Sequence, residues 1–297
     1  MNWRAWSAFA ALGIIWGLPY FFIKLAEVEL EPAMIAWCRT TIGAAILLPI
    51  AWRRGALRAL LQHKRAVFAF AVIEMAVPFT AISVGERWIS SSVAGMLIAT
   101  VPLWIALLAR CFGIRERLGA ARLSGLLLGF AGVAALVGFG GITGPAGWAG
   151  TGCILLATLG YAIGPLIVQR HLGGIDAYGP AAGSLAIAAL VLSPAAVLCL
   201  PKAVPSNLVL ASVVALGALC TALAVVLMFY LIEQAGASRT AVITYINPAV
   251  AALLGVGLLH EHFGAGGIAA FALILIGSWL ATRGTHERAG RGTAAVA

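Results

Sequence analysis

Two ionisable side chains stand deep inside long apolar segments, where they could bind a charged ligand or a proton. Glu74 lies about nine residues into the segment 66–86, or roughly 13 Å along a helix. Arg39 lies at a comparable depth in the segment 32–52. A charge at such depth in a bilayer costs a few kcal/mol and usually faces a cavity or a partner. Three roles stay open: Glu74 as a proton-coupling group, Arg39 as the partner of a substrate carboxylate, or the two together as a structural ion pair.

Aromatic and polar residues recur at matching depths in several apolar segments and could line a cavity for an amphipathic metabolite. The alternative is that the rings pack or face lipid while the hydroxyls bond to their own helix. Asn247 is the strongest candidate, because an amide in the bilayer core needs a hydrogen-bond partner. With Arg39, the candidate substrate-binding residues are Trp16, Tyr20, Phe79, Thr80, Ser83, Thr100, Tyr161, Tyr245 and Asn247. Trp104 and Thr244 lie at the same depths.

Five prolines fall inside the expected helices and are candidate hinges or kinks. A proline cannot donate to the carbonyl four residues earlier, so each is predicted to free an acceptor that must find a partner or line a wet cavity. The alternative is that neighbouring helices simply pack around them. The candidates are Pro19, Pro78, Pro102, Pro165 and Pro248.

The remaining polar motifs favour structural roles. Glu116 and Glu261 each precede an apolar segment and are expected to complement the positive end of that helix. Gly125 and Gly129 are four residues apart, a spacing that lets helices approach closely. The neighbouring residues His260 and His262 on a short loop do not predict a metal site.

The sequence shows no catalytic constellation. It lacks the zinc-protease helix motif, the nucleophile elbow and the nucleotide-binding loop. The five cysteines lie in or beside apolar runs without metal-ligand spacing, which favours buried small hydrophobic residues. We therefore expect no enzyme activity, no cofactor, no metal and no drive by ATP within this chain.

These side chains must be positioned by membrane helices. The chain is 62% hydrophobic and only 10% charged, a composition typical of membrane proteins. A spanning helix needs about 20 mostly apolar residues. The expected spans are 5–24, 32–52, 66–86, 90–110, 120–140, 147–169, 177–199, 208–232, 238–259 and 264–282. The fold class is therefore an all-α membrane protein.

The basic residues indicate the orientation. Most of the 19 Lys and Arg residues fall in the short loops on one side of the expected bundle. Cytoplasmic loops are enriched in these residues, so both termini and the tail 283–297 are predicted to be cytoplasmic. The same distribution explains the net charge of +9 without nucleic acid, which we exclude as a partner.

An internal repeat organises the chain. The stretches 92–133 and 238–278 share an apolar helix with a central proline, a charged loop and a Gly-rich helix, and Pro102 and Pro248 lie about 146 residues apart. The repeats are 5–140 and 147–282. Because each holds five spans, the second enters the membrane inverted relative to the first. Inverted repeats are an architecture of secondary transporters, whose sites lie near the midplane between the halves.

The chain resembles the EamA family of the drug/metabolite transporter superfamily over nearly its whole length. The resemblance rests on W-G-x-P-x-F-x-I-K at 16–24, on Arg39, and on two proline–glutamate–glycine successions, Pro102 with Glu116 and Pro248 with Glu261. It implies a ten-helix inverted-repeat carrier with a central cavity in the bacterial inner membrane. Many members are thought to export amino acids or related metabolites.

We expect a secondary carrier that exports a small metabolite, with an amino acid or a derivative preferred, by alternating access. The alternatives are an uncoupled facilitator or pore, and an exporter of drugs, organic cations or nucleosides. The expected partners are a small-molecule substrate and the lipid bilayer. Monomer and homodimer both stay open.

Overall fold

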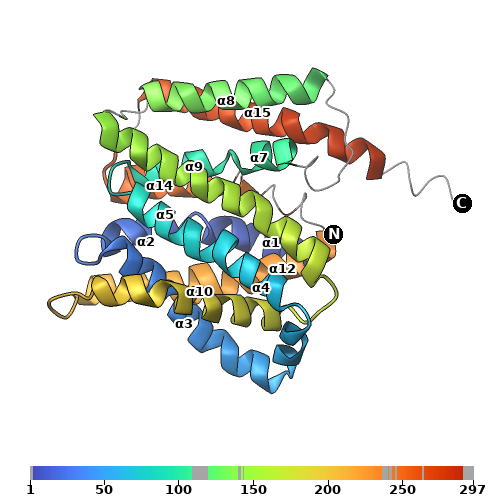
Figure 1. The fold of residues 1–297 in the computed structure, drawn as a ribbon. Coiled ribbons are helices and arrows are strands. Elements are labelled where there is room, and N and C mark those ends of the chain that lie inside the picture. The colour runs from blue at the N-terminus through green and yellow to red at the C-terminus, as the bar shows by residue number, and fades with distance from the viewer. Residues whose placement is uncertain are drawn as a thin grey trace, which may run out of the picture.

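The computed structural model describes residues 3–108, 120–139, 142, 144–235, 240, 243–244, 246–262 and 264–289, without the side chains of 59, 120–122, 139 and 282–289. These residues form an all-helical bundle (Figure 1). Tyr245 and Glu116, which the sequence singled out, lie outside the described residues.

Within the described residues, seven helical segments are long and apolar enough to cross a membrane. They cover 3–26, 32–53, 64–85, 91–108, 144–172, 178–198 and 207–235. Three shorter apolar helices cover 123–138, 247–258 and 265–281. The helix over this last stretch continues to residue 289, beyond the predicted end at 282.

The helices of the first part of the chain are α1 (Trp3–Ile15), α2 (Pro19–Ala26), α3 (Pro32–Arg53), α4 (Lys64–Phe70), α5 (Val77–Gly85), α6 (Ser91–Ile98), α7 (Val101–Leu108) and α8 (Ala120–Phe139). A short 3₁₀ turn, η1 (Ala56–Leu61), connects α3 to α4, and a π-helical turn, η2 (Ala71–Ala76), connects α4 to α5.

The helices of the second part are α9 (Gly144–Ile167), α10 (Tyr178–Leu198), α11 (Asn207–Gly217), α12 (Ala224–Ala235), α14 (Asn247–Leu258) and α15 (Ala265–Ala289). Two further π-helical turns are η3 (Val168–Leu172), which follows α9, and η4 (Ala218–Leu223), which connects α11 to α12.

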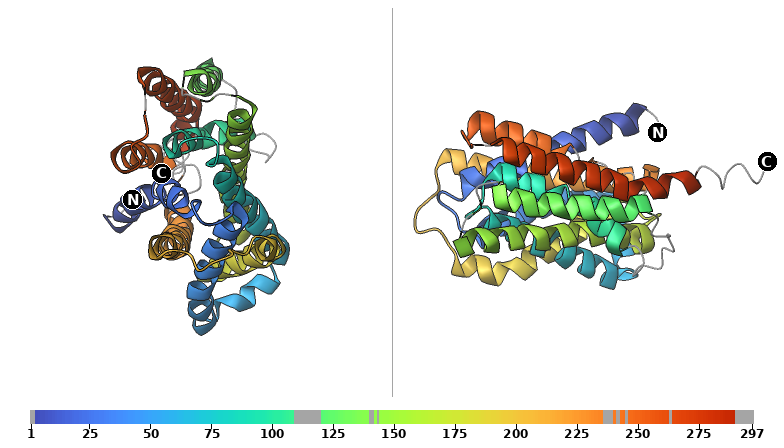
Figure 2. Two further views of the ribbon diagram at one scale, coloured as in Figure 1. Left: turned by 90° about the vertical axis from the view of Figure 1, so that its left-hand side faces the viewer. Right: turned by 90° about the horizontal axis from the view of Figure 1, so that it is seen from above.

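Segments far apart in sequence pack side by side. The main pairs are α8 with α15, α3 with α10, α6 with α14 and α5 with α9, while α1 and α2 pack on α12 and α11. Helix α1 begins and α15 ends at one end of the bundle (Figure 2). We call the opposite end, where α2, α5 and α14 end and α6 and α11 begin, the far end.

Glycines bring α8 and α15 close together, as their spacing predicts. A side chain at Gly125 would lie 2.7 Å from the carbonyl oxygen of Gly277, and one at Gly132 would lie 2.8 Å from the backbone nitrogen of Ile274. These glycines therefore serve a contact within the chain.

The prolines start helices more often than they bend them. Pro19 and Pro248 stand in the first turns of α2 and α14, and Pro102 is the second residue of α7. Proline suits a first turn, because its missing N–H has no partner there in any case. Pro165 lies inside α9, and Pro78 lies inside the continuous helical segment 64–85, directly after the π-helical turn η2. The expected continuous spans at 5–24 and 90–110 are thus each divided into two helices.

Pro19 cannot donate to the carbonyl of Ile15, and this freed acceptor finds another partner. Helix α1 ends at Ile15, and the tighter turn that follows lets the backbone N–H of Leu18 donate to this carbonyl at 3.3 Å. The acceptor is therefore satisfied where the helix breaks.

Glu261 complements a different helix from the one expected. Its carboxylate accepts hydrogen bonds from the backbone N–H groups of Ser91 at 2.7 Å and Ser92 at 2.9 Å, at the start of α6. Helix α15, which follows Glu261 in the sequence, begins only at Ala265. The carboxylate thus links the two parts of the chain at the far end.

Candidate substrate cavity

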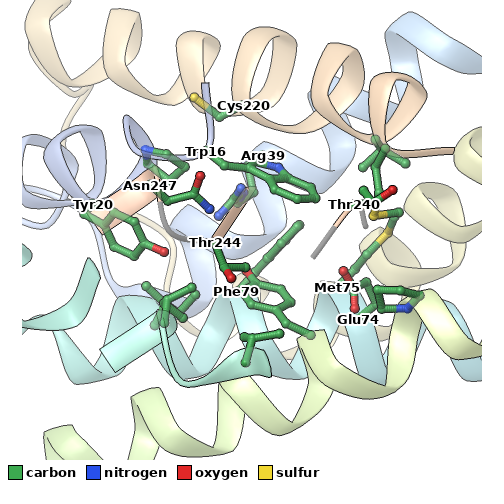
Figure 3. A pocket seen from close by; sticks show the side chains of 18 residues that line it. Trp16, Tyr20, Arg39, Glu74, Met75, Phe79, Cys220, Thr240, Thr244 and Asn247 are labelled. Carbon is green, nitrogen blue, oxygen red and sulfur yellow. The ribbon is translucent and has the colours of Figure 1, made fainter. Parts of the chain in front are cut away.

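A cavity of about 70 Å³ lies in the middle of the bundle, lined by residues from both parts of the chain. Figure 3 shows Tyr20 and Asn247 toward one end of the cavity and Glu74 and Met75 toward the other. Its predicted lining residues are Trp16, Pro19, Tyr20, Arg39, Glu74, Phe79, Tyr161, Pro165 and Asn247. Residues that the sequence suggested for different reasons therefore line the same cavity.

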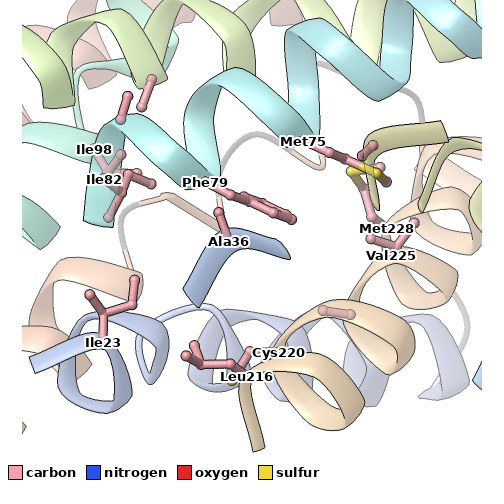
Figure 4. Close-up of a cluster of buried hydrophobic side chains, with 14 of the residues drawn as sticks. Ile23, Ala36, Met75, Phe79, Ile82, Ile98, Leu216, Cys220, Val225 and Met228 are labelled. Atoms are coloured by element: carbon pink, nitrogen blue, oxygen red, sulfur yellow. The ribbon is translucent and has the colours of Figure 1, made fainter. Parts of the chain in front are cut away.

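Most of the remaining wall is apolar. Met75 and Phe79 from η2 and α5 lie toward Val225 and Met228 from α12, while Ile82 of α5 lies farther from them (Figure 4). All five are buried. A largely apolar wall with a few charged and polar groups suits an amphipathic ligand.

Helix breaks place backbone dipoles at the cavity. Tyr20, Val101 and Asn247 line it, and they stand in the first turns of α2, α7 and α14. The first turn of a helix has unpaired N–H groups and carries the positive end of the helix dipole. The broken helices therefore favour negative charge in the cavity.

Arg39 is held in place by two contacts. Its side chain is 2% exposed, and its Nε donates to Thr221 Oγ1 at 3.1 Å. The guanidinium carbon lies 3.7 Å from the centre of the Phe79 ring. The other guanidinium N–H groups make no hydrogen bond within the described part of the chain. They are the donors that a ligand in the cavity can use.

Thr221 can orient Arg39 because of the π-helical turn η4. Its hydroxyl donates to the carbonyl of Leu216 five residues earlier, at 2.7 Å, and so leaves a lone pair for Arg39. π-helical turns are rare and frequently lie at functional sites.

Glu74 stands on the corresponding π-helical turn of the first part of the chain, η2. Its side chain is 7% exposed, and its Oε2 has no hydrogen-bond partner among the described atoms. The carboxylate lies against Gly164 of α9, where a side chain would collide with it. Within the described residues, no ion pair joins Glu74 to Arg39. The structural pair considered from the sequence does not form.

Asn247 joins two helix breaks. With its amide nitrogen facing them, it donates to the carbonyl of Gly13 at 2.9 Å and to that of Ile243 at 3.0 Å. This satisfies two carbonyls near the breaks that precede α2 and α14. Gly17 allows this approach, because a side chain there would lie 2.9 Å from the carbonyl oxygen of Asn247. Asn247 therefore has a structural partner in addition to its place at the cavity.

The comparisons with known proteins agree with this architecture. The EamA-like transporter family matches the chain twice, at residues 4–138 and 148–283. The chain belongs to this family. Among similar proteins is the uncharacterized inner membrane transporter YedA of Escherichia coli strain K12, 30% identical over 91% of this chain and 89% of that protein. An uncharacterized transporter of Archaeoglobus fulgidus is 26% identical over 94% of this chain and 99% of its own length.

A solved crystal structure shares the fold of this EamA protein. It superposes with a TM-score of 0.69, over 95% of this chain and 97% of that chain, at 20% identity. A likeness at this identity shows the fold alone.

Three hydroxyl residues predicted for the site of this EamA protein lie outside the lining. Each donates to a carbonyl of its own helical segment: Thr80 to Ala76 at 2.8 Å, Ser83 to Phe79 at 2.9 Å and Thr100 to Leu97 at 2.7 Å. This back-bonding is the alternative that the sequence left open. Among the candidate hinges, Pro78, Pro102 and Pro248 are also absent from the described lining.

Sequence reasoning missed other cavity residues. Met75, Ile82, Val225 and Met228 look like any other apolar residue of a span, so the sequence carries no signal for them. Thr221 also gave no signal in the sequence, since its role depends on the π-helical turn η4. The lining also includes Thr240 and Thr244, of which Thr244 lay among the polar residues at matching depth.

Proposed function

We propose that the protein is a secondary carrier that exports a small zwitterionic metabolite, an amino acid or a derivative, by alternating access through the central cavity. The observation that carries this proposal is the pair of opposite charges in one cavity. Arg39 presents unused N–H donors, Glu74 presents an unused carboxylate oxygen, and the two do not pair with each other. A zwitterion supplies the missing partner to both.

The carboxylate of the ligand would bind Arg39, and its ammonium would bind Glu74. The first turns of α2, α7 and α14 support the carboxylate end, because unwound transporter helices commonly direct their positive ends at anionic groups. Tyr20, Trp16, Tyr161, Phe79 and the thioethers of Met75 and Met228 would contact the substrate body.

The present cavity is contracted. Pockets for drug-sized ligands usually measure roughly 300–1,000 Å³, whereas this one measures about 70 Å³. It has space for a few water molecules. Substrate binding therefore requires the cavity to widen, which is consistent with a carrier that changes conformation.

The two parts of the chain would act as inverted repeats that move against each other. Supporting this are the double family match, the π-helical turns in both 64–85 and 207–235, and the reciprocal packing of α5 on α9 and of α12 on α1. Ten spans with both termini in the cytoplasm follow from the repeat and from the basic loops. The name of the Escherichia coli relative supports a bacterial inner membrane location.

A ligand screen on the purified protein tests the charge assignment. A ligand that binds only the folded state raises the unfolding temperature. Amino acids should stabilise the protein in free form, and blocking either the ammonium by acetylation or the carboxylate by amidation should abolish the shift. Equal stabilisation by free and blocked forms would refute recognition of a zwitterion. Stabilisation by organic cations alone would favour the drug and cation exporters.

A flux assay separates carrier from pore. In liposomes, a carrier saturates and exchanges labelled for unlabelled substrate across the membrane. Linear, non-saturating flux would show a facilitator or pore instead.

A further inference from the structure

The far end of the bundle holds reciprocal contacts between the two parts of the chain. Glu261, from the second part, accepts from Ser91 and Ser92 at the start of α6. Glu29, from the first part, accepts from the backbone N–H of Ser206 at the start of α11, at 2.7 Å. Each part therefore binds the positive end of a helix of the other. Together these contacts join the two parts of the chain at the far end.

Lys24 adds a clamp between α2 and α5. Its Nζ donates to Glu27 Oε1 at 2.7 Å and to the backbone carbonyl of Glu86. The second oxygen of Glu27 is buried without a hydrogen-bond partner in the described structure. The ammonium therefore bonds to one carboxylate and one carbonyl, and it leaves the carboxylate of Glu86 without a hydrogen bond.

Glu86 is a fully buried carboxyl group just beyond the span 64–85. It is 0% exposed, and neither of its carboxylate oxygens has a hydrogen-bond partner among the described atoms. An unpaired buried carboxylate costs several kcal/mol, and a bound proton removes that cost. The group is therefore placed to exist as a neutral acid in this conformation.

The charges that face Glu86 come from three regions. Lys24 and Glu27 lie near the end of α2, Glu261 lies before α15, and Arg39 lies on α3. Burial is the main cause that raises the pKa of Glu86; Glu27 and Glu261 raise it further, while Lys24 and Arg39 oppose the shift. Tyr20 of α2 also lies within electrostatic range.

We propose that Glu86 binds a proton from the far side when the far end closes, and that opening of the far end exposes Glu86 to water and releases this proton. The inference rests on the alternating access proposed above. It assigns the proton to the gate formed by Glu261 and Glu29 with their partners, whereas Glu74 in the cavity serves the substrate ammonium.

The proposal fixes the sign of the pH dependence. The closed state binds one more proton than the open state, so lowering the pH favours closure and raising it favours opening. For one proton, the ratio of closed to open molecules changes by at most about tenfold per pH unit.

Distance measurements between two spin labels at the far end test the proposal. Val28, after α2, and Leu258, at the end of α14, are 78% and 59% exposed and lie in different parts of the chain. Labels are attached to Val28→Cys and Leu258→Cys in a background without the five native cysteines. They should report a short distance when the far end is closed and a long distance when it is open. The measurement is made on the full chain in lipid nanodiscs between pH 5 and pH 8, with and without a stabilising amino acid.

The wild-type protein should shift toward the short distance as the pH falls. Glu86→Gln, which mimics the protonated acid, should keep the short distance with less than about a twofold change across this range. Lys24→Gln should move the wild-type midpoint to higher pH, because the ammonium opposes protonation. A purely structural role of Lys24 would instead weaken closure at every pH. The matched control is Glu31→Gln, an exposed far-end carboxylate paired with Arg87, and it should leave the profile unchanged.

Two outcomes overturn the proposal and are distinguishable. If both distances appear and respond to the amino acid, but their ratio does not depend on pH or depends on it equally in Glu86→Gln, only the proton gate fails. If a single distance appears under every condition, the alternating access on which the gate rests fails as well.

Discussion

Replacing Arg39 with methionine should abolish substrate binding without unfolding the protein. The substitution removes the positive charge from the cavity and keeps a long apolar side chain against Phe79. It leaves no orphaned hydroxyl, since Thr221 still donates to the carbonyl of Leu216 at 2.7 Å. Exchanging a buried charge for a well-packed apolar group is often neutral or stabilising. The unfolding temperature without ligand should therefore stay the same or rise.

The loss of affinity follows from the contacts of the guanidinium. Truncating one partner of a buried, hydrogen-bonded charge pair costs about 2–5 kcal/mol, which corresponds to about 30- to 4,000-fold in the dissociation constant. Thr221→Val removes only the contact that orients Nε, at 3.1 Å. This hydrogen bond exists without ligand as well, so its loss affects affinity only through the orientation of the guanidinium, and Thr221→Val should weaken binding less than Arg39→Met.

Titration of each variant with a stabilising amino acid and with its amidated form provides the assay. Wild type should prefer the free acid strongly, Thr221→Val less so, and Arg39→Met should bind the two forms equally. If Arg39→Met still preferred the free acid to the amide as strongly as wild type does, the assignment of Arg39 to the ligand carboxylate would be refuted.

Three further predictions concern the cavity wall, the packing and the far end. Gly164→Ala should displace the Glu74 carboxylate and abolish ligand-induced stabilisation, while Gly152→Ala on the same helix, which meets no atom within 4 Å, should not. Gly277→Ala should lower the free energy of unfolding by an amount typical of overpacking, about 1–3 kcal/mol, and thermal denaturation should report a lower unfolding temperature. Hydrogen bonding to Ser206 lowers the pKa of Glu29, so its cap on α11 is present above that lowered pKa and is lost as the pH falls through it. The Ser206 amide should therefore lose its protection from hydrogen exchange as the pH falls through this pKa, after correction for intrinsic exchange rates. Glu29→Gln should abolish this pH-dependent change.

The sequence located the charged cavity residues because depth alone is informative for them. A charge in the middle of an apolar span needs a polar environment, and both Arg39 and Glu74 line the cavity. Depth says nothing about the direction in which a side chain points around its helix. Thr80, Ser83 and Thr100 have suitable depths, yet their hydroxyls bond to their own helical segments.

The breaks and the far-end contacts needed the three-dimensional structure. Pro19 at the start of a helix and a proline inside a helix look alike in an apolar run, so the sequence predicted a kink where a new helix begins. The partner of Glu261 is about 170 residues away in sequence, and only the packing of α14 on α6 brings them together. Local reasoning assigned the carboxylate to the next helix instead.

Counterflow in proteoliposomes tests the central claim, that the cavity between the two parts of the chain carries a zwitterion by alternating access. Liposomes containing the protein are loaded with an excess of an unlabelled amino acid that stabilises it and are diluted into a trace of the labelled form. We expect the label to accumulate transiently inside the liposomes. This accumulation should saturate with substrate concentration and be absent in Arg39→Met. If the label only equilibrated across the membrane, linearly with concentration and equally in wild type and Arg39→Met, the claim of carriage by alternating access would be contradicted.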